Sequence, residues 1–167
     1  EYLGTEAQIS IFPTKILLAT DSSEEAELAL STAIDLANST NSQLHVVTVG
    51  PWNPDPSYAS HEASLRWETY EQASEAIRKE AQEILDNQVR KIEEGGGTVQ
   101  EAHLRRGRKD EEIVRVAEEI GAGLIVMGSR GLGGVRRALM GSVSDSVLRH
   151  AHCPVLVVRK EKHQAAL

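Results

Sequence analysis

The chain has 167 residues, a net charge of −7 and an isoelectric point near 5.4. Its length predicts one domain with a sizeable core, and its negative charge disfavours a nucleic-acid-binding domain. No apolar stretch approaches the ~20 residues of a membrane span, so neither nucleic acid nor a membrane is an expected partner. The one cysteine, Cys153, excludes an internal disulfide framework and suits a reducing compartment, so we expect a cytoplasmic protein.

The first half of the chain alternates short apolar runs with segments of helical periodicity. A strand is predicted at Lys15–Thr20, followed by a helix that begins after an N-cap in Asp21–Glu25 and stops at Asn38–Asn41. A second strand at Gln43–Val49 leads into Gly50–Ser60, whose three prolines exclude regular structure and predict a surface loop or lid.

The second half continues the alternation. A long helix is predicted at Glu62–Glu94 and a third strand at Thr98–Arg105. A helix at Glu111–Ile120, capped by Asp110, precedes a fourth strand at Leu124–Met127. The last predicted elements are the helix Val143–His150 and the strand Val155–Val158. This order predicts an α/β fold with a parallel sheet, helices on both faces and a Rossmann-like winding, and it leaves the strand order open. The expected organisation is a flexible N-terminal extension (1–13), one domain (14–160) and a C-terminal tail (161–167).

A glycine-rich segment, GSRGLGGVRRALMGS at Gly128–Ser142, separates the fourth strand from the last helix. Glycine lets the backbone approach an anion closely, and the first amides of a helix attract negative charge. The segment carries Arg130, Arg136 and Arg137 and has no acidic residue. Because ligands of open parallel sheets lie beyond the carboxyl ends of the strands, we predict an anion or nucleotide site here. The alternative is a flexible surface loop, since neither G-x-G-x-x-G nor G-K-[ST] is present.

Four residues of this segment, Gly128, Gly131, Gly141 and Ser142, fit the pattern G-x2-G-x9-G-[ST]. Further matching segments are Ile16–Ser23, Leu44–Val46, Glu111–Val114 and Cys153–Val158. Together they resemble the universal stress protein family, and the glycine pattern resembles its ATP-binding branch. The resemblance covers Lys15 to Arg159 and departs from the family at Lys109, where a proline is common. It implies the strand order 3-2-1-4-5 and a homodimer paired through Val155–Val158.

The resemblance also implies a cofactor, ATP, with Mg²⁺ or Mn²⁺ carried by its phosphates, and a set of contacting residues. Asp21 and Val46 match residues that approach the adenosine, and Ala19, Thr20 and Met127 line the site at the strand ends. The residues that match the phosphate side are Gly128, Ser129, Arg130, Gly131, Gly141, Ser142 and Val143. The resemblance therefore implies an ATP-binding protein that acts as a nucleotide-responsive regulator of a stress response.

Several alternatives stay open. Asp21 and Ser142 are each also suited to cap the helix that follows them. The pair His150 and His152 lacks nearby acidic partners, so we predict no zinc site there. Neither a Ser-His-Asp order nor paired carboxylates occur, so no catalytic residue is named. The alternative functions are a slow ATPase and a dimeric interaction module that binds no nucleotide.

Overall fold

The computed structural model describes residues 10–51, 64–130 and 140–160, with the backbone alone for 64–70. Its elements are β1 (Lys15–Ala19), α1 (Glu24–Thr40), β2 (Gln43–Gly50), α2 (Ser64–Glu94), β3 (Val99–Arg106), α3 (Lys109–Ile120), β4 (Leu124–Gly128), α4 (Ser142–His150) and β5 (Val155–Val158). Each strand and helix that the sequence predicts is therefore present in the described part of the chain. The predicted ends of these elements agree with the observed ones to within two residues.

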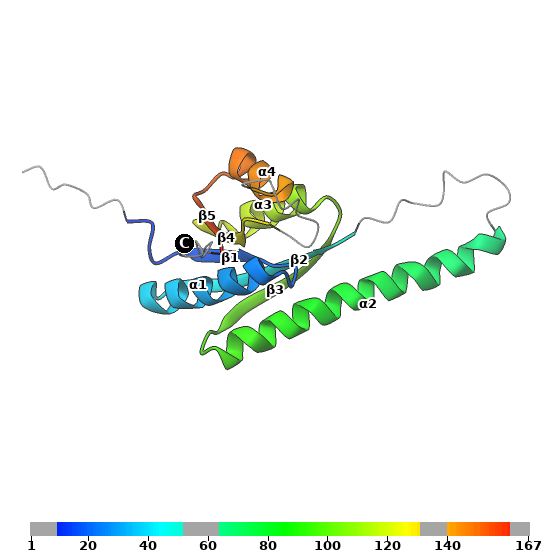
Figure 1. Cartoon of the computed structure of the whole chain (residues 1–167), viewed down its shortest axis with the longest axis horizontal. Coiled ribbons are helices and arrows are strands. Elements are labelled where there is room, and N and C mark those ends of the chain that lie inside the picture. The colour runs from blue at the N-terminus through cyan, green and yellow to red at the C-terminus, as the bar shows by residue number, and fades with distance from the viewer. Residues whose placement is uncertain (1–9, 52–63, 131–139, 161–167) are drawn as a thin grey trace, which may run out of the picture.

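The five strands form one parallel sheet in the order β3-β2-β1-β4-β5. The helices lie on both sides of it, α1 and α2 on one face and α3 and α4 on the other (Figure 1). The predicted α/β fold and strand order are thus confirmed. Because β1 and β4 are neighbours at the centre, their carboxyl ends form the point where the order of strands reverses and where such sheets bind ligands.

The sheet is buried on both faces, because its strands contribute alternate side chains to two cores. Leu18, Val46 and Val126 belong to the core under α1 and α2. Leu17, Ile125 and Met127 belong to the core under α3 and α4. The two cores hold the ends of β1 and β4 in a fixed relative position. Among the described residues, none of the helices combines the length and apolar composition needed to cross a membrane.

The helix α2 packs on the sheet with its C-terminal part and projects beyond the sheet at its N-terminal end (Figure 1). Ala81, Leu85, Gln88 and Ile92 are buried, whereas residues 71–80 include no buried side chain. Gln88 is a polar residue on this buried stripe, and it is fully buried.

The observed N-cap residues correct one predicted cap, that of α3, and decide the two caps that the sequence left open, those of α1 and α4. Arg108, not Asp110, is the N-cap residue of α3, and Asp110 lies in the first turn with its carboxylate accepting a hydrogen bond from Ser146 Oγ at 2.7 Å. The physical reason is that α3 starts two residues earlier than the apolar pattern indicates, at Lys109 instead of Glu111. The Asp110 side chain therefore does not cap the helix and can bind α4. Ser23, not Asp21, caps α1, and Gly141, not Ser142, caps α4.

Candidate functional site

The predicted site residues next to β1 and β4 come together at the centre of the sheet. Ala19 and Met127 are register partners on these two strands, and both are buried. Thr20 continues from β1, and Gly128 and Ser129 follow Met127 at the end of β4. The carboxyl ends of two adjacent strands and the start of α1 therefore meet at one point. Gly131 lies outside the described residues, as do Arg136 and Arg137 and most of the segment Gly50–Ser60.

The two flanks of the glycine-rich segment are joined through Ser129, which is fully buried. Its carbonyl oxygen accepts hydrogen bonds from Gly141 N at 2.7 Å and from Ser144 Oγ at 2.8 Å. Its amide donates to Val158 O at 2.9 Å, and its hydroxyl donates to the Glu25 carboxylate. The Gly141 amide is thus used inside the protein. The next amides, at Ser142 and Val143, lie in the first turn of α4, where no helical carbonyl is available to them.

One glycine of the motif, Gly128, is required by packing, and a second, Gly141, is closely packed. A Cβ atom at Gly128 would lie 2.9 Å from the backbone carbon of Glu25 and 3.0 Å from its Cβ. A Cβ at Gly141 would lie 3.2 Å from Ser129 O. Backbone atoms cannot move aside as a flexible side chain can, so a side chain at Gly128 would displace the first turn of α1. These glycines therefore build the junction whether or not an anion binds there.

The polar residues after β1 are bound within the protein. Asp21 Oδ1 accepts a hydrogen bond from Ser23 N at 3.1 Å. Thr20 Oγ1 donates to Gln88 Oε1 at 3.1 Å, and Gln88 Nε2 donates to Glu27 Oε1 at 3.0 Å. Lys91 Nζ lies 2.6 Å from the same Glu27 oxygen. The Thr20 hydroxyl thus links the end of β1 to α1 and α2, and Gln88 is a residue that sequence reasoning missed. Its only sequence signal is its place on the apolar stripe of α2.

Val46 lies apart from the other predicted residues. It is fully buried in the core under α1 and α2 and pairs with Leu18 on β1. Ala19 and Met127 belong to the core on the opposite face of the sheet. The structure therefore does not bring the side chain of Val46 to those of Ala19 and Met127.

Arg130 is the cation that follows β4. Its carbonyl accepts a hydrogen bond from Ser23 Oγ at 3.3 Å, which holds its backbone against the cap of α1. Its Nε atom is buried and has no hydrogen-bond partner among the residues that the structure describes. Buried polar groups are almost always paired, so the guanidinium group is suited to accept an anionic partner. The first turn of α4, with the exposed Ser142 and the half-buried Val143, follows on the other side of Ser129.

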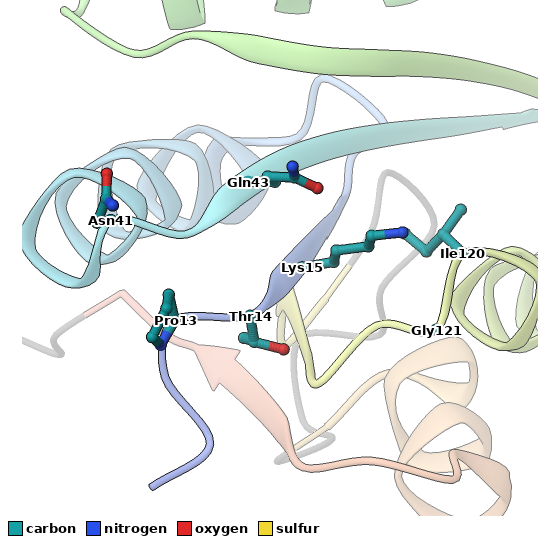
Figure 2. Close-up of a pocket in the computed structure, with 7 residues that line it drawn as sticks. All are labelled: Pro13, Thr14, Lys15, Asn41, Gln43, Ile120 and Gly121. Carbon is teal, nitrogen blue, oxygen red and sulfur yellow. The ribbon is translucent and has the colours of Figure 1, made fainter.

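A hollow of about 430 Å³ lies at the opposite end of the sheet. Figure 2 shows the Lys15 side chain reaching across it toward Ile120. Its lining residues are Pro13, Thr14, Lys15, Asn41, Gln43, Ile120 and Gly121. Because it lies where β1 and β2 begin, it is separate from the switch point and from the predicted nucleotide site.

The contact between two histidines, His45 on β2 and His103 on β3, was also not predicted from the sequence. His45 Nδ1 and His103 Nε2 lie 3.3 Å apart, within hydrogen-bonding distance. Burial lowers the pKa of both imidazoles, so the neutral rings are favoured in the folded protein. The two residues are far apart in sequence and no spacing motif links them, so only the pairing of the strands brings them together.

Comparison with known proteins gives one family. The model of the universal stress protein family matches residues 13–159. The universal stress protein MJ0531 of Methanocaldococcus jannaschii is 37% identical over 150 residues, which cover 90% of this chain and 84% of that protein. The solved structure of the protein MJ0577 is similar with a TM-score of 0.73 at 28% identity, covering 90% of this chain and 99% of that one. A universal stress protein of Archaeoglobus fulgidus, solved in complex with dAMP, is similar with a TM-score of 0.59 at 25% identity. The match covers 89% of this chain and 99% of that one.

Proposed function

We propose that this chain, which belongs to the universal stress protein family, binds ATP at the carboxyl ends of β1 and β4 and acts as a nucleotide-responsive regulator. The observation that carries the proposal is the buried, unpartnered Nε of Arg130 beside the switch point of the sheet. An anionic group bound there gives this nitrogen the partner that the described protein residues do not supply. The similar protein of Archaeoglobus fulgidus that was solved with dAMP supports an adenine nucleotide as the source of the anion.

The chain's own residues divide between the two ends of the nucleotide. Arg130 and the first amides of α4, at Ser142 and Val143, suit the phosphates, because a helix start and a guanidinium group both favour negative charge. Asp21 suits the adenosine end, where its carboxylate can accept a hydrogen bond from a hydroxyl or an amine. In this proposal Gly131 lets the backbone approach the phosphates, which carry Mg²⁺ or Mn²⁺.

Three of the predicted contacts do not contribute to the proposal in their present arrangement. The Gly141 amide is bonded to Ser129 O, and the Thr20 hydroxyl is bonded to Gln88. The Val46 side chain is enclosed in the core. Affinity is therefore expected to depend on Arg130 and on the amides of α4, and much less on these three groups.

Calorimetric titration of the whole chain with ATP and Mg²⁺ tests the proposal. We expect saturable binding that weakens about tenfold or more in Arg130→Gln, because a hydrogen bond to a charged group contributes about 1.5–3 kcal/mol. The matched control is Arg149→Gln, which removes an exposed arginine of α4 that pairs with Asp145 and should leave the affinity unchanged. Absence of binding in the unchanged chain contradicts the proposal.

The edge strand β5 supports a further part of the proposal, a homodimer. This strand is the last of the sheet, so one of its edges has no partner strand among the residues that the structure describes. Its Leu156 side chain is exposed, and Val155, Val157 and Val158 are half-buried. Unpaired apolar edges of this kind readily pair with another chain. Light scattering should find a dimer that dissociates in Leu156→Lys. A dimer that binds no ATP would instead favour the interaction module over the nucleotide-binding regulator.

A further inference from the structure

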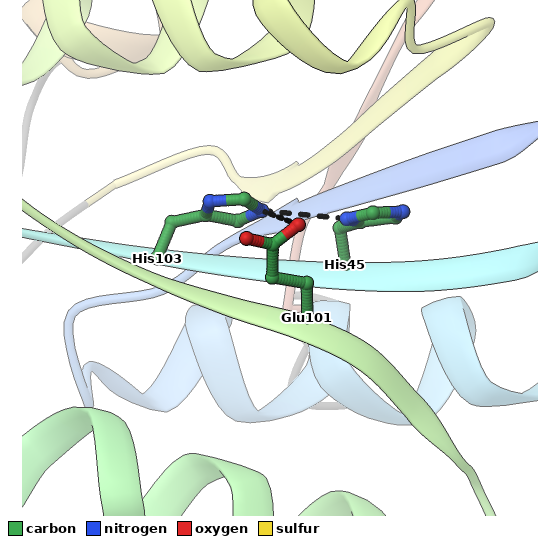
Figure 3. A group of neighbouring side chains, drawn as sticks. All are labelled: His45, Glu101 and His103. Carbon is green, nitrogen blue, oxygen red and sulfur yellow. Dashed lines mark hydrogen bonds and ion pairs between the residues drawn. The ribbon is translucent and has the colours of Figure 1, made fainter.

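Three side chains with metal-binding atoms meet on the neighbouring strands β2 and β3. They are His45, Glu101 and His103, and their ligand atoms all lie within 4.8 Å of one another. His45 has the parity of Val47 and Val49, which belong to the core under α3 and α4, so the cluster lies on that face of the sheet. Figure 3 shows the two imidazole rings edge to edge, with a nitrogen of each directed toward the other and the Glu101 carboxylate beside the gap between them.

A β-bulge creates this cluster. Leu44 pairs with Val99, but the next residue, His45, pairs with Glu101, so Gln100 is the extra residue of β3. If the register continued without a bulge from the pair Leu44 and Val99, Gln100 would lie opposite His45. Glu101 and His103 would then point to the other face of the sheet. The bulge therefore aligns all three potential ligands on one face of the sheet.

The distances within the cluster are close to those of a metal site. His45 Nδ1 and His103 Nε2 are 3.3 Å apart. Two imidazole nitrogens bound to one tetrahedral Zn²⁺ at ~2.0–2.1 Å stand ~3.3–3.4 Å apart, so an ion fits between the rings with a tilt of each ring and no change in their separation. Glu101 Oε2 is 3.9 Å from His103 Nε2. This side chain is 62% exposed, so a rotation can bring its oxygen closer.

Burial and access also suit a bound ion. His45 is buried and the His103 side chain is only 9% exposed, so both imidazoles lie largely out of solvent. The exposed Glu101 leaves a path from solvent. Nε2 of His45 has no hydrogen-bond partner among the described residues, so no contact there opposes the tautomer with its hydrogen on Nε2, which leaves the Nδ1 lone pair for a metal.

We infer that His45, Glu101 and His103 form a binding site for a transition metal ion of the zinc class, with water in the fourth position. Two imidazoles and one carboxylate are a ligand set that such ions favour over Mg²⁺ or Ca²⁺, which prefer oxygen ligands. The other charged groups near the rings are Lys15 and the ion pair of Arg105 with Glu119. This inference goes beyond the proposed function, because the site takes a metal without a nucleotide.

The test is titration of the whole chain, treated with a chelator and free of nucleotide, with Co²⁺ followed by absorption and with Zn²⁺ followed by calorimetry. We expect one saturable site with the intense visible absorption of tetrahedral Co²⁺. Loss of a partner of a metal ligand typically weakens binding 10–100-fold, so Glu101→Gln and His103→Gln should each weaken it by at least about tenfold. Because Glu101 is exposed, Glu101→Gln is expected to fold as the unchanged chain does.

The matched control is the double variant His150→Gln and His152→Gln, which removes the other close pair of histidines and should leave the affinity unchanged. The inference is overturned if the unchanged chain shows no saturable binding, or if Glu101→Gln and His103→Gln bind as tightly as the unchanged chain. Loss of binding in the control variant also overturns it, because the metal would then lie near the C-terminal histidines. A circular dichroism spectrum of each variant separates loss of a ligand from loss of the fold.

Discussion

Buried polar groups occur in two regions of the sheet, at the end of β4 in its centre and along β2 and β3 at its edge. In the centre, the buried Ser129 bonds through its amide, carbonyl and hydroxyl to other parts of the chain. At the edge, His45 Nε2 and Thr48 Oγ1 are buried without a hydrogen-bond partner among the described residues. A buried unsatisfied polar group costs about 1–3 kcal/mol, so the edge retains groups that stability alone does not favour.

The difference teaches that a motif and a site are separable. The glycines that match the family motif are used first for packing, since Gly128 contacts Glu25 and Gly141 is bonded to Ser129. Arg130 Nε is the buried nitrogen in this region that lacks a partner in the described part of the chain. Binding capacity in the centre therefore resides in a polar atom that the fold leaves unpaired. At the edge it resides in His45 Nδ1, His103 Nε2 and the Glu101 carboxylate, which contact one another.

Gln88 links α2 to the end of β1 and to α1, and removing it should have the largest effect. It is fully buried in α2 and bonds to Thr20 after β1 and to Glu27 on α1. Gln88→Ala leaves a cavity and deprives both partners, so the free energy of unfolding should fall by about 2–4 kcal/mol. Urea unfolding measures it. The control on the same helix is Gln82→Ala, whose hydrogen bond to Asp86 is exposed and whose effect should stay within about 0.5 kcal/mol. Equal losses in the two variants would contradict the role of Gln88.

The centre can be disturbed at Gly128. The methyl group of Gly128→Ala would meet backbone atoms of Glu25 and Ala26 at 2.9–3.1 Å. Overpacking of this kind costs about 1–3 kcal/mol, and the loss should appear in urea unfolding without any nucleotide. Gly141→Ala has more room, with its closest contact at 3.2 Å, and should lose less. A Gly128→Ala variant as stable as the unchanged chain would show that the glycine serves only ligand binding.

Two buried threonines allow the comparison to be made with one chemical change. Thr20 Oγ1 is bonded to Gln88, whereas Thr48 Oγ1 has no partner among the described residues. Replacing a hydroxyl by a methyl group should cost about 1–3 kcal/mol in Thr20→Val, since Gln88 loses its partner. Thr48→Val should leave the unfolding free energy unchanged or raise it by up to about 1 kcal/mol. A substantial loss of stability in Thr48→Val would reveal a partner for this hydroxyl.

The fold was accessible from the sequence because each element carries its own local signal. Strand-length apolar runs and amphipathic periodicity gave the elements, and the family resemblance gave the strand order. The start of α3 was misplaced because Asp110 has the chemistry of a cap but binds Ser146 on another helix. Long-range partners of this kind leave no local pattern in the sequence.

The candidate site was accessible only in part. The residues at the end of β4 were predicted because their motif lies in one segment of the sequence, and those at the end of β1 were predicted from the family resemblance. Gln88, His45 and His103 were missed because strand register and helix packing define their partners. The bulge at Gln100, which turns Glu101 and His103 toward His45, has no signal that the sequence pattern could reveal.

The smallest expected effect concerns the hydrogen bond between Ser146 on α4 and Asp110 on α3. Unlike the fully buried groups at the centre and the edge of the sheet, this pair is only partly buried. The hydrogen bond from Ser146 holds the pKa of Asp110 below its ordinary value, opposed by burial and aided by Arg108. A folded pKa below the unfolded one means that the contact stabilises the fold at a pH above the unfolded pKa of about 3.9. This contribution is lost as the pH falls through the folded pKa.

In Ser146→Ala the pKa of Asp110 should therefore rise, which NMR titration of its carboxyl group measures. The stability at pH 7 should fall by about 1 kcal/mol or less, and this difference should shrink in acid. The exposed Ser31→Ala is the control, and an Asp110 titration that is the same in Ser146→Ala would show that the hydrogen bond from Ser146 does not lower this pKa.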